Sequence, residues 1–228
     1  MHGTRDEVLA NLATIRGAIA DACERAGRAT DAVTLVGAAK TVPSDVVGWV
    51  AQGGIHAIGH NYVRELRSMH DQVPGVRWHF IGTLQASSAH HVAALADVVE
   101  TTAGERATRR LARRAREAGR VVDVLIEVDL TGERSGVAPE ALPAFADLVS
   151  DLEGLRLRGL MTLPPVPERA EDARPWFVRL RELRDVLART HPQVVDLSMG
   201  MSLDYAVAVE EGATMVRIGT ALFGPRAT

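Results

Sequence analysis

Residues 33–43 read VTLVGAAKTVP, and this stretch is the first of a series that decides the fold. Its residues up to Ala39 are apolar or small apart from Thr34, which is typical of a strand buried on both faces. Lys40 ends the run. Ser44, just beyond Pro43, can cap a short helix that extends through Gln52. The stretch therefore predicts a strand, a turn that carries a lysine, and a helix.

The same order of strand and helix recurs along the whole chain. A helix over 4–27 comes first, because Val8, Leu12, Ile15 and Ile19 fall on one helical stripe. Later helices are expected near 44–52, 62–71, 86–96, 105–119, 139–151, 169–189 and 203–212. Eight strand-like runs alternate with them, at 33–40, 54–61, 76–83, 97–103, 121–130, 155–163, 194–201 and 213–224.

Alternating strands and helices require parallel strands, because each crossover needs a connection about as long as a helix. Eight such units favour an α/β fold of the closed (β/α)8 TIM barrel type over an open doubly wound sheet. Every strand except the last is expected to be followed by a helix. Because the chain ends at Thr228, soon after the eighth strand, we expect a single domain over 1–228. It would have an extra N-terminal helix, no C-terminal β domain and a monomeric state.

The composition disfavours several classes of protein. The 228 residues are 46% hydrophobic and 24% charged, which is typical of a globular fold. A net charge of -3 favours neither nucleic acid nor a membrane as a partner, and the arginine-rich helix at 105–119 is interpreted as a solvated outer helix. Cys23 is the only cysteine, so neither an intrachain disulfide nor a cysteine-based zinc site is expected, and no metal is predicted. The charged N-terminus is unlike a secretory signal and no membrane span is present, so a cytoplasmic location is expected.

Lys40 allows two interpretations. Most lysines are solvated, and a solvated side chain would simply end the strand. At the mouth of a barrel, however, apolar neighbours favour the neutral amine, which can attack an aldehyde and form a Schiff base. The choice between them depends on the residues nearby.

Two glycine-containing loops favour the reactive lysine. SMGMS (198–202) and RIGTALFG (217–224) follow the seventh and eighth strands, where this fold usually binds phosphate. Glycine lets backbone N–H groups approach an anion, and serine or threonine hydroxyls add donors. Either loop alone is equally well explained as a tight turn, but both together favour a phosphate site. An aldehyde-binding lysine beside a phosphate site predicts pyridoxal 5′-phosphate as the cofactor.

The sequence also resembles a known family, the pyridoxal phosphate homeostasis proteins of the YggS/PROSC type. These are similar in fold to the N-terminal barrel of alanine racemase. The resemblance covers nearly the whole chain, and WHFIG, GLM and SMGMS with RIGTALFG are specific in combination. The matching stretches are LVGAAKTVP, IGHNYVREL, WHFIGTLQ, VLIEVDLTGERSG, LRGLMTLPP and LSMGMSLDYAVAVEEGATMVRIGTALFG.

The resemblance implies that Lys40 carries the cofactor as a Schiff base. Arg217 would face the pyridine nitrogen, where a permanent cation disfavours protonation of the ring and makes it a weaker electron sink. The remaining assignments also rest on the resemblance, and no residue receives a catalytic role. The phosphate site would comprise Ser198, Gly200, Ser202, Gly219 and Thr220, and the residues near the cofactor would be Asn61, His79 and Met161.

The sequence departs from the family pattern at the rim of the expected site. His60 stands in GHNY where the family usually has glutamate, and we expect a surface histidine beside the pocket rather than a catalytic one. Thr83, Ser87 and Ser88 replace a frequent proline and a later Asn-Lys pair, and Arg134 replaces a frequent lysine. These changes leave attachment of the cofactor untouched. They put in doubt any role of the rim in regulation or in partner docking.

The expected function is intracellular vitamin B6 homeostasis without robust catalysis. The protein would hold pyridoxal phosphate on Lys40, buffer the reactive aldehyde and pass it to apo-enzymes. The alternative is a cofactor-dependent amino-acid racemase with weak or specialised activity, which needs acid/base groups on both faces of the substrate carbanion. Alanine racemase takes the second group, a tyrosine, from a separate β domain, and the tyrosines here are Tyr62, the one to test, and Tyr205. A third interpretation, a Schiff-base aldolase acting on a phosphosugar, is disfavoured by the resemblance.

Overall fold

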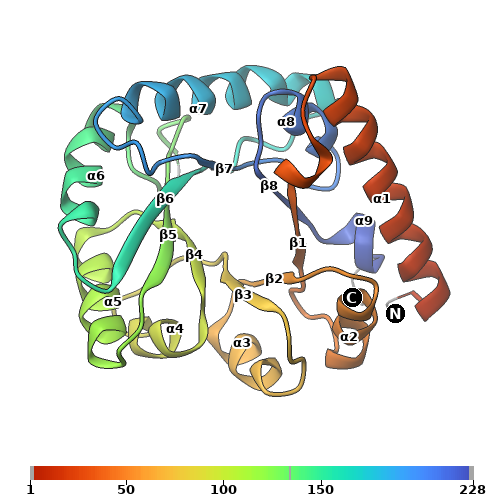
Figure 1. The fold of residues 1–228 in the computed structure, drawn as a ribbon, viewed down its shortest axis with the longest axis horizontal. Coiled ribbons are helices and arrows are strands. Elements are labelled where there is room, and N and C mark those ends of the chain that lie inside the picture. The colour runs from red at the N-terminus through yellow and green to blue at the C-terminus, as the bar shows by residue number, and fades with distance from the viewer. Residues whose placement is uncertain (1–2, 134, 226–228) are drawn as a thin grey trace.

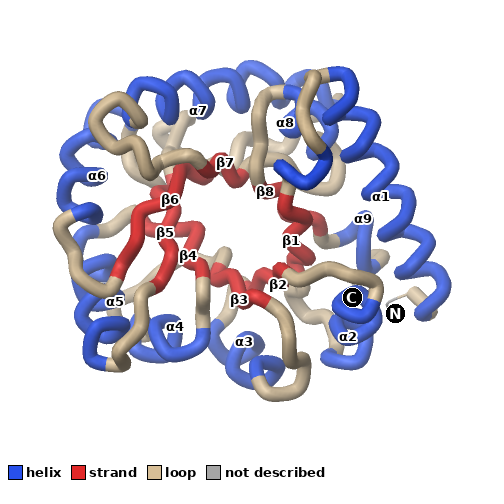
Figure 2. The backbone as a smooth tube through the Cα atoms, in the orientation of Figure 1, coloured by secondary structure: helices blue, strands red, loops and turns tan. Residues whose placement is uncertain are grey.

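The strands of the protein close into a barrel (Figure 1). The computed structural model describes residues 3–133 and 135–225. Its strands lie in the order β1 to β8 with every neighbouring pair parallel, and β1 pairs with β8 to close the ring. Figure 2 shows the strands as an inner ring with the helices outside it. The TIM-type (β/α)8 barrel predicted from the sequence is confirmed.

Each strand lies within the run of residues predicted for it. The strands are β1 (Thr34–Ala38), β2 (Ala57–His60), β3 (Arg77–Phe80), β4 (Val98–Thr102), β5 (Val122–Glu127), β6 (Leu155–Met161), β7 (Asp196–Ser198) and β8 (Met215–Ile218). The helices are α1 (Arg5–Arg25), α2 (Ser44–Gln52), α3 (Val63–His70), α4 (Ala89–Leu95), α5 (Glu105–Glu117), α6 (Leu142–Ser150), α7 (Arg174–Leu187), α8 (Tyr205–Glu210) and α9 (Thr220–Phe223). Short 3-10 turns are η1 (Thr30–Ala32), η2 (Pro139–Ala141) and η3 (Ala170–Ala173).

One prediction about the order of elements is wrong, because a helix does follow the last strand. This helix, α9, is a single turn that begins after Gly219 and ends at Gly224, whose φ of 84° lies in the left-handed region. Four residues are too few to show a helical period in the sequence. Packing holds the turn in place: Leu222 and Phe223 are buried, and the side-chain amide of Asn11 on α1 donates a hydrogen bond to the carbonyl of Leu222 at 3.2 Å.

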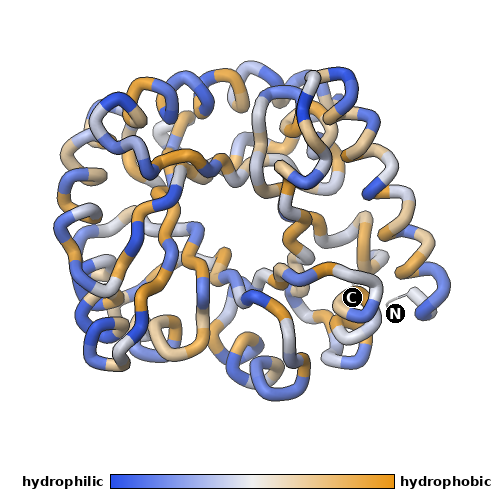
Figure 3. Tube along the Cα trace, viewed as in Figure 1, coloured by the Kyte–Doolittle hydropathy of each residue, from blue (hydrophilic) through white to orange (hydrophobic). Residues whose placement is uncertain are grey.

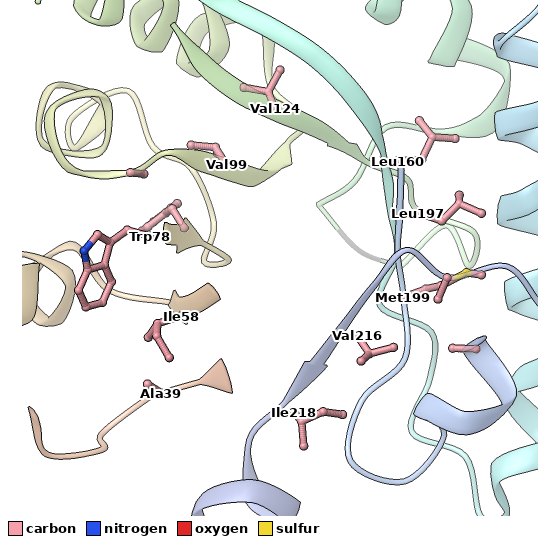
Figure 4. Packing of buried hydrophobic residues seen from close by; sticks show 14 of the residues in the cluster. Ala39, Ile58, Trp78, Val99, Val124, Leu160, Leu197, Met199, Val216 and Ile218 are labelled. Atoms are coloured by element: carbon pink, nitrogen blue, oxygen red, sulfur yellow. The ribbon is translucent and has the colours of Figure 1, made fainter. Parts of the chain in front are cut away.

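The strands bury side chains on both faces, and the two faces have different neighbours. Figure 4 shows Ile58, Val99 and Leu160 among the side chains packed in the layer between barrel and helices. A smaller cluster fills the barrel interior. Along β4, Val98 belongs to this inner cluster and Val99 to the outer layer, so the next residue, Glu100, faces inward. The alternation thus places charged side chains inside the barrel.

The helices direct apolar stripes at the barrel and polar faces at solvent. Figure 3 shows hydrophobic and hydrophilic segments alternating along them. On α5 the buried residues are Thr108, Leu111, Ala112 and Ala115, whereas Ala118, which follows the helix, is exposed. The arginines of α5 face outward and pair locally, for example Arg109 with Glu105 at 2.8 Å. Within the part of the chain that the structure describes, no helix has the length and apolar character needed to span a bilayer.

Candidate functional site

A cavity of about 380 Å³ opens at the carboxyl ends of the strands, where barrels of this type bind their ligands. We call it the mouth cavity. Its wall includes seven of the ten residues predicted for the cofactor site, namely Lys40, Asn61, Met161, Ser202, Arg217, Gly219 and Thr220. The rest of the wall is mainly apolar and comprises Ala38, Val42, Ile81, Leu163, Val166, Pro167, Met201, Leu203, Asp204, Phe223 and Gly224.

Lys40 lies on this wall, half-buried, just after β1. The backbone N–H of Ala39 donates to the carbonyl of Gly59 on β2 at 2.9 Å, so strand pairing continues to the residue before the lysine. Thr41 then adopts a φ of 61°, the only positive φ of a non-glycine residue within 3–133 and 135–225. This left-handed conformation is rare for threonine and is typical of functional turns. The strand therefore ends in a sharp turn that keeps Lys40 at the cavity.

Lys40 is also the only lysine of the chain, a feature of the sequence that singles it out. Lysine and arginine together number 26, and 25 of them are arginine. An ε-amino group that can attack an aldehyde thus occurs at one position, and that position lies on a cavity wall. The Lys40 Nζ atom lies 5.4 Å from the centroid of the Tyr62 ring, within the range of a cation–π contact.

The loops after β7 and β8 meet at one side of the mouth cavity. The hydroxyl of Ser202 accepts a hydrogen bond from the backbone N–H of Ala221 at 3.2 Å, which joins the two loops. Asp204 accepts one from the N–H of Met201 at 2.6 Å and closes the SMGMS turn, and burial raises the pKa of its carboxyl. Hydroxyls and free backbone N–H groups in such turns are the donors that a phosphate group requires. Thr220 adds a second hydroxyl on the same wall.

Three of the predicted residues do not reach the wall of this cavity. Ser198 is fully buried inside the barrel, where its hydroxyl donates to Glu100 at 2.6 Å. Gly200 has a φ of 92°, and a Cβ there would lie 2.6 Å from the Cβ of Ala208, so the turn itself requires glycine. His79 also bonds Glu100 at 2.6 Å and lines a different cavity, of about 780 Å³, at the amino ends of the strands. We call this second space the amino-end cavity.

Arg217 supplies a permanent cation to the mouth cavity, and its side chain is 4% exposed. One guanidinium nitrogen donates to the carbonyl of Thr162 at 2.9 Å and the other to the hydroxyl of Ser198. Burial lowers the pKa of Arg217, and the charge of Glu100, 3.8 Å away, opposes that shift. Arginine nevertheless stays charged in proteins. The cavity thus presents a fixed guanidinium in addition to the amine of Lys40.

Glu100 was not predicted from the sequence. It is fully buried, and its two carboxylate oxygens bond His79 and Ser198, each at 2.6 Å. Burial raises the pKa of Glu100, but the hydrogen bond to His79 and the charges of His79 and Arg217 outweigh burial, so the pKa is lowered overall. The available signal was the acid in the middle of the strand VVETT (98–102). A buried carboxylate requires partners, and these lie on three other strands.

His60 is not the surface histidine that was expected beside the pocket. It is fully buried and stacks on Trp78 in the outer layer, with ring centroids 5.8 Å apart. Its Nδ1 lies 3.5 Å from Glu65, and neither ring nitrogen has a hydrogen-bond partner among the described residues. Burial lowers the pKa of His60, and the charge of Glu65 opposes the shift. Ala57 belongs to the inner cluster, so His60, three positions later, faces away from the barrel interior.

The altered rim residues lie away from the mouth cavity. Thr83 and Ser87 are exposed, and Ser88 is half-buried where α4 begins. The hydroxyl of Ser88 donates to the carbonyl of Gln85 at 3.1 Å. None of these three residues lines the cavity. Arg134 lies outside the described residues.

The groups on the wall fit pyridoxal phosphate. An amine is present for the aldehyde, hydroxyls and turn N–H groups for the phosphate, and a guanidinium and apolar side chains for the ring. The volume lies within the range of about 300–1,000 Å³ that is usual for small-molecule sites. Among the residues described, no group of three or more His, Cys, Asp or Glu side chains is placed to hold a metal ion.

Comparison with known proteins agrees with this chemistry. Residues 11–227 match the family model of the alanine racemase N-terminal domain, so fold and site define a barrel protein of the alanine racemase type. The pyridoxal phosphate homeostasis protein of Aquifex aeolicus is 41% identical over 213 residues, which cover 91% of this chain and 93% of that protein. The protein of the same name from Escherichia coli K12 is 35% identical, and the match covers 97% of each chain. The chain therefore belongs to the pyridoxal phosphate homeostasis protein family.

Solved structures show the same architecture. PipY of Synechococcus elongatus, solved with pyridoxal phosphate bound, has a TM-score of 0.85 and 29% identity, and the match covers 95% of this chain and 100% of PipY. An alanine racemase of Clostridium difficile in complex with cycloserine has a TM-score of 0.78 at 14% identity, over 98% of this chain and 60% of the racemase. The second likeness shows a shared fold alone.

Proposed function

We propose that this protein binds pyridoxal 5′-phosphate at Lys40 and serves in its homeostasis, holding the reactive aldehyde and limiting its free concentration. The observation that carries the proposal is the position of the only lysine. Lys40 lies on the wall of the mouth cavity, to which two loops also contribute hydroxyl and backbone donors. The names of the relatives and the cofactor bound to PipY support the same conclusion.

Each part of the cofactor would have its own partner on the wall. The bound group supplies an electrophilic aldehyde and a conjugated ring. Lys40 would hold the aldehyde carbon, and Ser202 and Thr220 with nearby backbone N–H groups would orient the phosphate. Arg217 would face the ring as a fixed cation, so the ring is not activated as it is beside a carboxylate. Buried Met161 would exclude water from that side.

The attachment of pyridoxal phosphate is tested by borohydride reduction, proteolysis and mass spectrometry. With one lysine in the chain, we expect one adduct per molecule, on the peptide that contains Lys40. Lys40→Arg keeps the positive charge but cannot form the adduct, so it should give none while folding as the wild type does. An adduct elsewhere, or no adduct in the wild type at saturating cofactor, would contradict the proposal.

We further propose that the bound cofactor can be passed to apo-enzymes of the same compartment. The half-buried position of Lys40 supports this step, because a second amine can reach it. The test mixes loaded protein with an apo-enzyme in the presence of a phosphatase that destroys free pyridoxal phosphate. Reactivation faster than that given by the same amount of free cofactor indicates transfer. Equal rates indicate that the protein only buffers. A monomeric state and a cytoplasmic location remain predictions.

A weak racemase is the second candidate function, and the position of Tyr62 favours it. Its ring is the aromatic group over Lys40, and the residue is 52% exposed, so a substrate could approach both. Two acid/base groups around one carbon are what racemisation requires. Racemase activity that Tyr62→Phe abolishes while cofactor binding is retained would establish this function. Absence of activity in loaded wild-type protein would remove it.

A further inference from the structure

A polar network crosses the interior of the barrel beneath the mouth cavity. It consists of His79 on β3, Glu100 on β4, Ser198 on β7 and Arg217 on β8, and each of these residues is 5% exposed or less. Of the four, Arg217 lines the mouth cavity and His79 lines the amino-end cavity. The network therefore runs from one end of the barrel interior towards the other.

Hydrogen bonds connect these residues in a fixed order. His79 and the Ser198 hydroxyl each bond one oxygen of Glu100 at 2.6 Å. The same hydroxyl accepts a hydrogen bond from Arg217, whose other terminal nitrogen donates to the carbonyl of Thr162 at 2.9 Å. Ser198 thus donates to the acid and accepts from the guanidinium. Two bonds, to Ser198 on β7 and to Thr162 just after β6, fix the orientation of the guanidinium plane.

Glu100 also compensates the charge of the network. A buried guanidinium without a counter-charge is unfavourable. Breaking a buried ion pair therefore costs more free energy than breaking an exposed one. The Glu100 carboxylate lies 3.8 Å from Arg217. The carboxylates of Glu127 and Asp204 also favour the charged guanidinium. Glu100 therefore acts on Arg217 in two ways. It orients the guanidinium through Ser198, and its negative charge stabilises the guanidinium cation.

We propose that Glu100 is a positioning residue of the cofactor site, which orients Arg217 through Ser198 and moderates the positive charge that Arg217 directs at the bound ring. This inference rests on the proposed function, because the ring is that of pyridoxal phosphate. The inference adds Glu100 to the residues that shape the cofactor site. Glu100 does not line the mouth cavity and acts through the side chain of Ser198.

The test compares two isosteric substitutions that each remove one buried negative charge. Glu100→Gln alters the network. Asp123→Asn is the matched control, because Asp123 is 5% exposed and pairs with Arg77 and Arg156 but does not line the mouth cavity. The visible absorbance of bound pyridoxal phosphate is titrated with pH in both variants and in the wild type. The other carboxylates that act on Arg217, Glu127 and Asp204, remain unchanged in both variants, as do Lys40 on the same cavity wall and His79 beside Glu100.

We expect the absorbance midpoint of Glu100→Gln to move to lower pH by on the order of one unit. The reason is that loss of a nearby negative charge makes a protonated ligand less stable. Asp123→Asn should keep the wild-type midpoint. An unchanged midpoint in folded Glu100→Gln would overturn the inference and leave the proposed function intact, whereas a wild type that binds no cofactor would overturn the proposed function.

Ser198→Ala provides the test if Glu100→Gln does not fold. This variant keeps the charge of Glu100 but removes the hydroxyl that joins it to Arg217. The inference predicts an affinity for pyridoxal phosphate that is about threefold to tenfold weaker, the usual worth of one hydrogen bond. Wild-type affinity in Ser198→Ala would overturn the role of Glu100 as a positioning residue.

Discussion

Ser198 and Ser202 lie in one short motif, SMGMS, yet they have different surroundings. Ser202 lies on the wall of the mouth cavity, and its hydroxyl contacts the loop after β8. Ser198 is buried between Glu100 and Arg217. The sequence motif predicts a phosphate role for both residues, whereas only Ser202 lies on the cavity wall, where a direct contact with a ligand is expected. Comparing the binding of pyridoxal phosphate with that of pyridoxal, which lacks the phosphate, distinguishes the two roles.

We predict that Ser202→Ala lowers the preference for pyridoxal phosphate over pyridoxal by about tenfold, because it removes a hydrogen bond to a charged group. Ser198→Ala should weaken both ligands alike and leave the preference unchanged. The measurement is the dissociation constant of each variant for the two aldehydes, from visible absorbance. A loss of preference in Ser198→Ala as large as in Ser202→Ala would contradict this separation.

His60 makes the stability of the fold depend on pH. Burial lowers its pKa in the folded protein below the ordinary value of 6.5, so at mildly acidic pH the unfolded chain binds a proton that the folded chain does not. The free energy of unfolding should therefore fall as pH decreases below about 6.5, by at most about 1.4 kcal/mol per pH unit for one group.

The test of this pH dependence is urea unfolding between pH 5 and 8. His60→Phe keeps an aromatic ring against Trp78 and should flatten the dependence over that range. His90→Phe is the control, since His90 is exposed on α4 and should behave as the wild type does. The same slope in His60→Phe and in the wild type would show that other groups cause the effect.

At the scale of elements, the loop between β7 and α8 shapes one side of the site. Gly200 has a φ of 92° and lies against Ala208 of α8, and its carbonyl accepts a hydrogen bond from the N–H of Arg217 at 3.0 Å. Gly212, after α8, also has a positive φ, 99°, but a Cβ there would meet no atom closer than 3.5 Å. The two glycines therefore share a backbone requirement and differ in packing.

We predict that Gly200→Ala lowers the free energy of unfolding by about 2–4 kcal/mol, because a left-handed backbone and a steric overlap act together. Gly212→Ala should cost only about 1–2 kcal/mol, from the backbone alone. Denaturant unfolding measures both, and cofactor affinity should fall in Gly200→Ala only. Equal losses of stability would show that packing against Ala208 is unimportant.

The sequence predicted the elements better than it predicted the faces of the strands. Length and order of the apolar runs were sufficient for the barrel, and Lys40 was placed correctly because it follows the first run directly. The positions of His60 and Glu100 were missed because successive side chains of a strand point to opposite faces. An error of one position along the strand therefore assigns a side chain to the wrong face. Both strands are buried along their whole length, and a strand buried on both faces has no exposed polar face that would fix its phase. The single turn α9 is held by packing that the sequence does not show.

Across the whole molecule, the barrel is joined least extensively where β7 meets β8. Their paired register consists of Ser198 with Met215, whereas β1 and β8 pair over four positions. The mouth cavity includes this part of the ring, because its wall contains Lys40 after β1, Ser202 after β7 and Thr220 after β8, in addition to residues at the ends of β2, β3 and β6. A ligand held by all three would link β1 to β7 and β8.

We therefore predict that pyridoxal phosphate stabilises the fold and protects one side of the barrel more than the other. At 100 times the dissociation constant, linkage gives about 2.7 kcal/mol, which should appear as a higher Tm. Hydrogen exchange should slow mainly in β1, β7 and β8, and little in β4 and β5, whose carboxyl ends contribute no residue to the cavity wall. Lys40→Ala at the same cofactor concentration is the control and should show much less protection. Uniform slowing over all eight strands would mean that the ligand stabilises the whole barrel rather than the contacts of β1, β7 and β8.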